Sequence, residues 1–265
     1  MKYILVLLVT LSSLFAATNI QSTHASSFGE AMVSVLEDSR DITETAQVQI
    51  VHNSPYPVVD VYVDGALALE DVPYRASTGL VDLPVSTEVG IAPADGDVIA
   101  TFPFELAENG TYVVVASGIV GDDTHPFNLL ASTLATAAVD NDHFALKVMH
   151  GVTDAPAVDI YADGTLLVEN LAYGDFQGYL QVPVGDYTLD ITGHGSTDPV
   201  ASFSAPLSSF GGGSGVVYAS GFLAPAETDS AFALVLTTPN GDVVTLPAAE
   251  TAFNGTAQVQ IVHNS

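Results

Sequence analysis

Histidine recurs at one position of a repeated segment, where an imidazole could bind a metal ion or hold a loop. His52, His150 and His263 each end a short apolar stretch, and a Ser-Pro or Ala-Pro loop follows the first two. A metal site would need further histidines or carboxylates, and the sequence spaces none so that they would converge there. We therefore interpret this histidine as structural, with its ring hydrogen-bonded to the backbone of the loop that follows.

Aspartate and tyrosine alternate in the strand predicted after each histidine. Asp60 and Tyr62 stand two residues apart, as do Asp159 and Tyr161. Each pair shares one face of its strand, because successive side chains point to opposite faces. The pair could bind a ligand. The interpretation that we favour is that the carboxylate satisfies a neighbouring loop or strand edge.

Two acidic loops offer closely spaced oxygens, which suit calcium. Asp122 and Asp123 lie in one loop, and Asp140 and Asp142 lie in the segment between the two repeats described below. No EF-hand loop or glycine-rich nonapeptide loop accompanies them. Calcium is the one cofactor that the sequence indicates, and acidic loops exposed to solvent are the simpler interpretation.

Motifs of catalysis are missing from the sequence. It contains no G-x-S-x-G, no H-E-x-x-H and no Walker A loop, and the glycine-rich residues 211–215 precede a predicted strand rather than a helix. Paired carboxylates could still hydrolyse a glycoside, but the chain has no tryptophan to stack on a sugar. We expect a protein that is not an enzyme.

The charge of the chain excludes several classes of partner and site. Its 265 residues hold 31 Asp and Glu against 4 Lys and Arg, a formal net charge of −27. A row of phosphates could not be neutralised, so we expect no nucleic-acid partner. The absence of cysteine excludes disulfides, thiolate metal sites and a lipoprotein anchor. The acidity could serve divalent cations or, as we favour, solubility in salt.

The first 25 residues have the pattern of a secretory signal peptide. Lys2 precedes an apolar run, and small residues flank a cleavage position after Ala25. The apolar run is shorter than the roughly 20 residues that span a bilayer. We therefore expect cleavage, no membrane span in the mature chain, and an extracellular or cell-surface location.

A repeat at domain spacing is the main signal of the sequence. Residues 48–52 and 57–65 (VQIVH and PVVDVYVDG) recur as residues 146–150 and 156–164 (LKVMH and PAVDIYADG). Later segments match as well: Val72-Pro73-Tyr74 answers Leu171-Ala172-Tyr173, and the Ala-Ser-Gly at 116–118 recurs at 219–221.

The beginning of a third copy stands at residues 256–265, identical over ten residues to residues 45–54. We interpret it as the first strand of a truncated third repeat in a longer array. A spare strand of this kind could alternatively replace its equivalent in a neighbouring molecule, so that residues 256–265 would drive self-association.

The His, Ser/Ala-Pro and Val-Asp-Val/Ile-Tyr-x-Asp-Gly motif resembles the secreted bacterial and archaeal family known as domain of unknown function 4397. The resemblance covers residues 46–134 and 144–246. It implies an extracellular, often repeated β-domain of cell-surface proteins, and it supplies no catalytic residues.

Short β-branched segments separated by turn residues predict an all-β chain, with two tandem antiparallel β-sandwich domains of the immunoglobulin-like kind after the signal peptide. Asp64-Gly65 and Asp163-Gly164 predict tight hairpins. The expected segments are a signal peptide (1–25), an acidic leader (26–44), repeat 1 (45–135), a linker (136–143), repeat 2 (144–247), and a linker with the first strand of the third repeat (248–265).

The function that these features predict is that of an exported, non-catalytic repeat module, acting as a structural spacer or adhesion element on a cell-envelope, glycan or protein partner. The alternative is a module that binds calcium or carbohydrate through the loops between its strands.

Export has a direct test. We expect the protein recovered from the medium or the cell surface to begin at Ser26, because small residues precede that bond. Mass spectrometry of the intact exported chain measures this. A mature chain that keeps residues 1–25 would contradict the signal peptide.

Overall fold

The computed structural model describes residues 44–249. The predicted signal peptide, all of the acidic leader except Glu44, and the segment 256–265 lie outside the described residues. No helix among residues 44–249 has both the length and the apolar character needed to cross a membrane.

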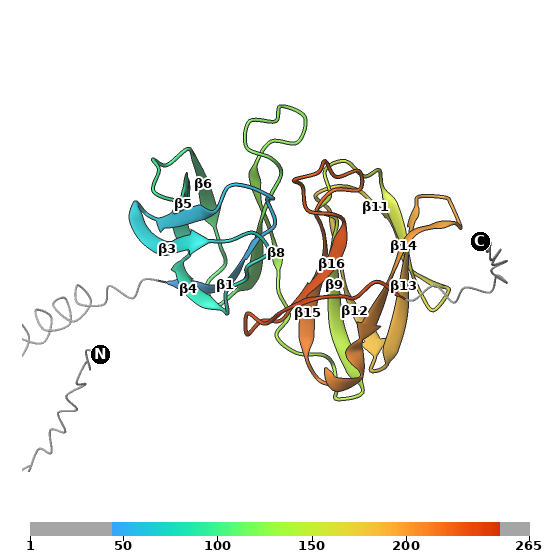
Figure 1. Ribbon diagram of the computed structural model, residues 1–265. Helices are drawn as coiled ribbons and strands as arrows, with labels where there is room; N and C mark the ends of the chain where they lie inside the picture. Colours follow the sequence, from blue (N-terminus) through green and yellow to red (C-terminus); the bar gives the residue numbers. More distant parts are fainter. Residues whose placement is uncertain (1–43, 250–265) are drawn as a thin grey trace, which may run out of the picture. The chain divides into compact units, whose positions relative to one another are not determined.

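Repeat 1 is a sandwich of two four-stranded sheets (Figure 1). One sheet has the order β4-β1-β7-β8 and the other the order β3-β2-β5-β6. The strands are β1 (Thr45–His52), β2 (Val59–Val63), β3 (Ala66–Val72), β4 (Val81–Pro84), β5 (Ser86–Pro93), β6 (Ala100–Glu105), β7 (Thr111–Ser117) and β8 (Asn128–Thr133).

Repeat 2 follows the same order of strands and adds one more. Its sheets are β12-β9-β15-β16-β17 and β11-β10-β13-β14. The elements are β9 (His143–Met149), β10 (Val158–Ala162), β11 (Thr165–Leu171), β12 (Phe176–Pro183), β13 (Asp186–Gly193), β14 (Pro199–Pro206), the short 3₁₀ helix η1 (Leu207–Ser209), β15 (Ser214–Ser220), β16 (Ala233–Thr237) and β17 (Val243–Thr245).

The predicted fold class is confirmed: the described residues form two all-β sandwiches in tandem. Most neighbouring strands are antiparallel, but β1 pairs with β7 in parallel, and β9 pairs with β15 in the same way. One parallel pair in each repeat therefore joins the first strand to the seventh.

Strand β4 begins at Val81, and the residues before it contact β1 without forming a regular ladder. The amide of Ile50 donates to the Thr78 hydroxyl rather than to a backbone carbonyl, at 2.9 Å. This side-chain contact replaces one backbone hydrogen bond between the two segments. Before Val81, the segment therefore pairs with β1 only through an isolated bridge between Val51 and Ser77.

Each repeat has its own apolar core between its two sheets. In repeat 1 the inward valines of β2, Val59 and Val61, pack with Val89 and Ile91 of β5. The core of repeat 2 is larger and includes Phe144, Leu146 and their neighbours on β10, β13 and β16. The valine face of β2 is thus the core face, as alternation along the strand predicts.

The two predicted hairpins are tight turns with positive φ at both central residues. Asp64 and Gly65 have φ of 49° and 80°, and Asp163 and Gly164 have φ of 47° and 76°. A two-residue turn of this hand matches the twist of its strands, and glycine adopts the second conformation at little steric cost.

Candidate functional site

The two repeats meet through an interface of buried side chains. Strand β1 points Val48 and His52 into its own core and Gln49 and Val51 out of it, yet all four are buried. The outward side chains of the equivalent sheets meet in a third apolar cluster, formed by Val51, Val113, Val115, Leu134, Met149, Val216, Tyr218 and Val235. The central strands β1, β7, β9 and β15 are therefore largely buried on both faces.

Several polar contacts across this interface come in reciprocal pairs. Tyr74 and Tyr173 occupy the same repeat position, as do Ser117 and Ser220. The Tyr74 hydroxyl lies 2.6 Å from the Ser220 hydroxyl, and the Tyr173 hydroxyl lies 3.3 Å from the Ser117 hydroxyl. Each tyrosine therefore contacts the serine of the other copy. An interface in which the same two positions meet in both directions has two-fold character.

A second reciprocal pair has the same geometry but different chemistry. Gln49 and Lys147 are equivalent, and so are Ser132 and Thr237 on the last strand of the shared sheet order. The Gln49 amide nitrogen donates to the Thr237 hydroxyl at 3.1 Å, and the Lys147 ammonium donates to the Ser132 hydroxyl at 2.6 Å. The pseudo-symmetry thus includes two sets of polar contacts.

Gln49 is fully buried and ties three segments together. Its amide nitrogen also lies within hydrogen-bond distance of the Ser77 hydroxyl (3.0 Å) and of the carbonyls of Thr78 (3.1 Å) and Thr238 (2.5 Å). Its own carbonyl has no hydrogen-bond partner among the described residues. An unpaired buried acceptor costs free energy, so the glutamine fixes the register of the interface at a cost in stability.

Lys147 is a buried cation whose neighbours are aromatic. It is 3% exposed, and its ammonium lies 4.8 Å from the centre of the Tyr179 ring and 5.8 Å from that of Phe176. Burial lowers the pKa of Lys147. Ring faces stabilise a cation of this kind, although less than a carboxylate would.

One contact of the interface is asymmetric and depends on a glycine. The Asn53 amide donates to the carbonyl of Ala219 at 3.1 Å, and the equivalent residue of repeat 2 is Gly151. A Cβ at position 151 would collide with the Asn53 amide nitrogen and would lie 2.6 Å from the Ala219 carbonyl oxygen. Asparagine in one copy therefore requires glycine in the other.

The repeated histidines lie beside this interface as buried side chains that bond backbone. Nε2 of His150 lies 3.0 Å from the carbonyl of Pro156, in the Ala-Pro loop, and Nδ1 of His52 lies 3.1 Å from the carbonyl of Val72, at the end of β3. Burial lowers the pKa of both imidazoles. Both rings are therefore neutral at pH 7 and act as hydrogen-bond donors to those carbonyls.

Asp60 and Asp159 hold a bulge in the strand next to their own. The Asp60 carboxylate accepts the amide of Asp71 at 2.8 Å, and Asp159 accepts that of Asn170 at 2.7 Å. Asp71 and Asn170 have φ of 52° and 53°, where the register of β3 and β11 shifts. Each carboxylate thus pins a left-handed residue of a β-bulge.

Asp159 has two further donors. The Gly195 amide and Nδ1 of His194 each lie 2.9 Å from one of its carboxylate oxygens. The two backbone amides, followed by His194, lower the pKa of Asp159 to about 2. Tyr62 and Tyr161, predicted to share this face, are half-buried.

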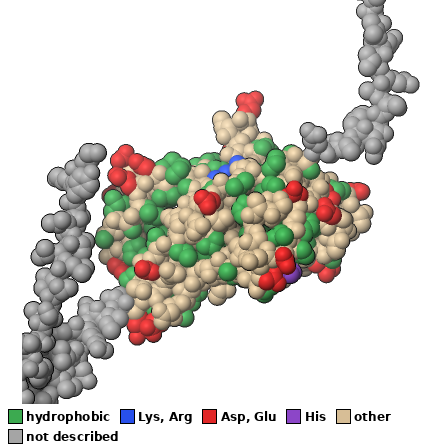
Figure 2. Space-filling view, turned by 90° about the horizontal axis from the view of Figure 1, so that it is seen from below, with side chains coloured by type: hydrophobic (Ala, Val, Ile, Leu, Met, Phe, Trp, Pro, Cys, Tyr) green, Lys and Arg blue, Asp and Glu red, His purple; other side chains and the backbone are tan. Residues whose placement is uncertain are grey.

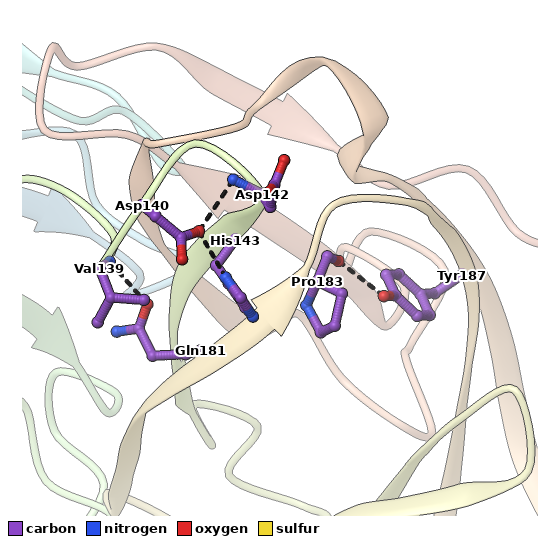
Figure 3. A network of polar contacts seen from close by, with 7 residues as sticks. All are labelled: Val139, Asp140, Asp142, His143, Gln181, Pro183 and Tyr187. Atoms are coloured by element: carbon purple, nitrogen blue, oxygen red, sulfur yellow. Dashed lines mark hydrogen bonds and ion pairs between the residues drawn. The ribbon is translucent and has the colours of Figure 1, made fainter.

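The acidic loops use their carboxylates for local turns. Asp140 accepts the amide of Asp142 at 2.9 Å and Nδ1 of His143 at 2.6 Å (Figure 3), and the contact with His143 is the main reason why the pKa of Asp140 is lowered. Asp122 accepts the amides of Thr124 and His125.

No group of three or more His, Asp or Glu side chains that could hold a metal ion occurs among residues 44–249. On the face shown in Figure 2, the Asp and Glu side chains lie in several small groups distributed over the surface. Calcium at Asp122, Asp123, Asp140 and Asp142 stays a prediction without a ligand cluster to support it.

The sequence interpretation missed the side chains that join the repeats, including Tyr74, Lys147 and Tyr173. A signal for them exists in the sequence: Tyr74 and Ser117 recur in repeat 2 at positions outside the core motif. Their recurrence showed that the copies are related, but not that they contact each other.

Comparison with known families agrees with the repeat. The family described as "Domain of unknown function (DUF4397)" matches twice, over residues 46–143 and 144–265. The chain belongs to this family. Its two matches meet between His143 and Phe144, at the start of β9. No curated protein matches the chain.

The charge of Asp159 has a testable consequence for stability. Its pKa is lowered from the ordinary 3.8 to about 2 in the folded chain, so it stabilises the fold above about pH 4 and loses this contribution as the pH falls toward 2. Asp159→Asn should lower the denaturation midpoint at pH 7, and the difference from the parent should shrink between pH 4 and pH 2. Urea unfolding across that pH range measures it.

Asp60→Asn is the matched comparison, because Asp60 accepts a single backbone amide in the described part of the chain. Its effect at pH 7 should be smaller than that of Asp159→Asn. Equal effects at every pH would show that the extra donors of Asp159 contribute nothing.

Gly151→Ala should destabilise the chain by about 1–3 kcal/mol, the usual cost of overpacking. The added methyl group meets the Asn53 side chain and the Ala219 carbonyl. Adding Asn53→Ala should recover the part of the loss that comes from the other repeat, a coupling that a double-mutant cycle measures. Gly193→Ala is the control, because a Cβ there meets nothing within 4 Å. Additive single effects would contradict the contact.

Proposed function

We propose that the chain is an exported, non-catalytic β-sandwich module of a cell-surface or extracellular protein, in which the two repeats form one rigid block that acts as a spacer or adhesion element. The observation that carries this proposal is the apolar cluster shared by the two repeats. Tandem domains joined only by a linker would move independently, whereas a shared, fully buried cluster couples them.

The polar groups of the described residues support a structural use. His52, His150, Asp60 and Asp159 all bond backbone groups of neighbouring segments. A hydrogen bond of this kind holds a loop or a bulge in place, and it leaves the ring or carboxylate committed to the fold. These four side chains recur in both copies because each domain needs the same loop and the same bulge to be held in place.

The linker contributes to the same rigidity. The carbonyl of Ala135 accepts the Ser214 hydroxyl at 2.7 Å, and the amide of Val139 donates to the Gln181 side chain at 3.1 Å (Figure 3). A Cβ at Gly211 would collide with the carbonyl of Asn141, so the glycine-rich segment lets the linker lie directly against repeat 2. Because the linker is hydrogen-bonded to repeat 2, it restricts bending between the two repeats, and a rigid spacer requires that restriction.

Rigidity of the pair can be measured by spin labelling, since the chain has no cysteine of its own. Leu67 and Leu166 are exposed, equivalent positions on β3 and β11. With cysteine at both, pulsed electron paramagnetic resonance should give a single narrow distance distribution. Val113→Asp, which places a charge in the shared cluster, should broaden it, while Val139→Asp, at a position 70% exposed, should not.

Circular dichroism establishes that the Val113→Asp chain keeps its β structure. A broad distribution in the parent would contradict a rigid block. Turnover of a glycan or peptide by the purified chain would overturn the non-catalytic part of the proposal. A rise in melting temperature with millimolar calcium would favour the ligand-binding alternative, since saturation at 100 times the dissociation constant stabilises by about 2.7 kcal/mol.

A further inference from the structure

The core of repeat 2 contains an apolar cavity that repeat 1 has only in reduced form. Its volume is about 80 Å³, against about 30 Å³ for the equivalent space in repeat 1. Leu146, Val148, Ile160, Leu189 and Val217 are among the side chains that line it. Protein interiors are close-packed, so a space of this size in only one of two related domains calls for a reason.

The lining offers a ligand almost no polar partner. His150 is the one lining residue with a titratable side chain, and both of its ring nitrogens are engaged: Nε2 with the Pro156 carbonyl and Nδ1 with the Val152 amide. A molecule that entered with a polar group would lose its hydrogen bonds to water without replacement. Only an apolar group fits the chemistry of this space.

The two copies differ beside the cavity. Val59 pairs with Pro93 in repeat 1, and the equivalent Val158 pairs with Gly193 in repeat 2. Gly193 lines the cavity, and a Cβ built on it meets nothing within 4 Å. Where repeat 1 carries a proline ring, repeat 2 therefore leaves space.

The cavity reaches the surface at the same end of the sandwich. Val200 and Leu223 line it and are 55% and 40% exposed. The loop that holds Leu223 is fixed, because the Asp154 carboxylate accepts the amides of Leu223 and Ala224, each at 2.8 Å. The opening therefore has an apolar rim with a carboxylate behind it.

We propose that repeat 2 binds the end of an uncharged alkyl chain, which enters between Val200 and Leu223 and occupies the cavity beside Gly193. The space is about half that of an engineered cavity that holds benzene, so it accepts a chain end rather than a whole drug-sized ligand. The chain beyond it lies along the exposed rim. The net charge of −27 and the Asp154 carboxylate disfavour an anionic head group.

Methyl NMR of the mature chain tests the site, with xenon and 1-decanol as probes. Both should shift the methyl signals of Leu189 and Val217 in repeat 2, and leave those of their equivalents in repeat 1, Val89 and Val114, unchanged. Gly193→Leu should weaken 1-decanol binding at least tenfold, because its side chain occupies the space that the alkyl chain needs. Unshifted cavity methyls, or equal shifts in both repeats, would overturn the proposal.

A second variant leaves the interior of the fold untouched. Val200→Asp should also weaken 1-decanol binding, while Ile99→Asp, at the equivalent and 48% exposed position of repeat 1, should not. Decanoate should bind at least tenfold more weakly than 1-decanol. Decanoate that binds as tightly as 1-decanol would contradict an uncharged ligand. Unchanged 1-decanol affinity in both the Gly193→Leu and the Val200→Asp variants would contradict binding at this place.

Discussion

The burial of the central strands of one sheet of each repeat on both faces is the constraint on which the rest of the described structure depends. In an ordinary sandwich, a strand buries alternate residues and exposes the others. Here β1 and β7, and their equivalents β9 and β15, bury both sets. Neither of these sheets can face water without exposing valines, a methionine and a tyrosine, so each repeat completes the fold of the other.

Reciprocal contacts make this association a closed one. The two Tyr-Ser contacts, and likewise the Gln-Thr and Lys-Ser contacts, use the same positions on both copies. An interface of this kind satisfies both partners at once, because each presents the same patch. The two repeats of one chain thus form the kind of two-fold interface that a symmetric dimer forms between two chains.

The two copies have nevertheless diverged where symmetry would be costly. One copy carries Gln49 where the other carries the buried Lys147, so the interface removes one ammonium group from water rather than two. Two asparagines at positions 53 and 151 would collide, and one is glycine. The same divergence reaches the interior: repeat 1 has Pro93 and a cavity of about 30 Å³, whereas repeat 2 has Gly193 at the equivalent position and a cavity of about 80 Å³.

The sequence by itself determined the local and periodic features of this protein. The hairpins at Asp64-Gly65 and Asp163-Gly164, the core face of β2 and the tandem sandwiches follow from alternation, turn chemistry and the repeat, because these depend on neighbours along the chain. Only the tertiary structure decided the partner of the second face of β1. Gln49 and Thr237 stand far apart in sequence, and alternation shows that a side chain points away from its own core without showing what covers it. The parallel pairing of β1 with β7 and the space beside Gly193 were likewise decided by packing between distant strands, which no local pattern encodes.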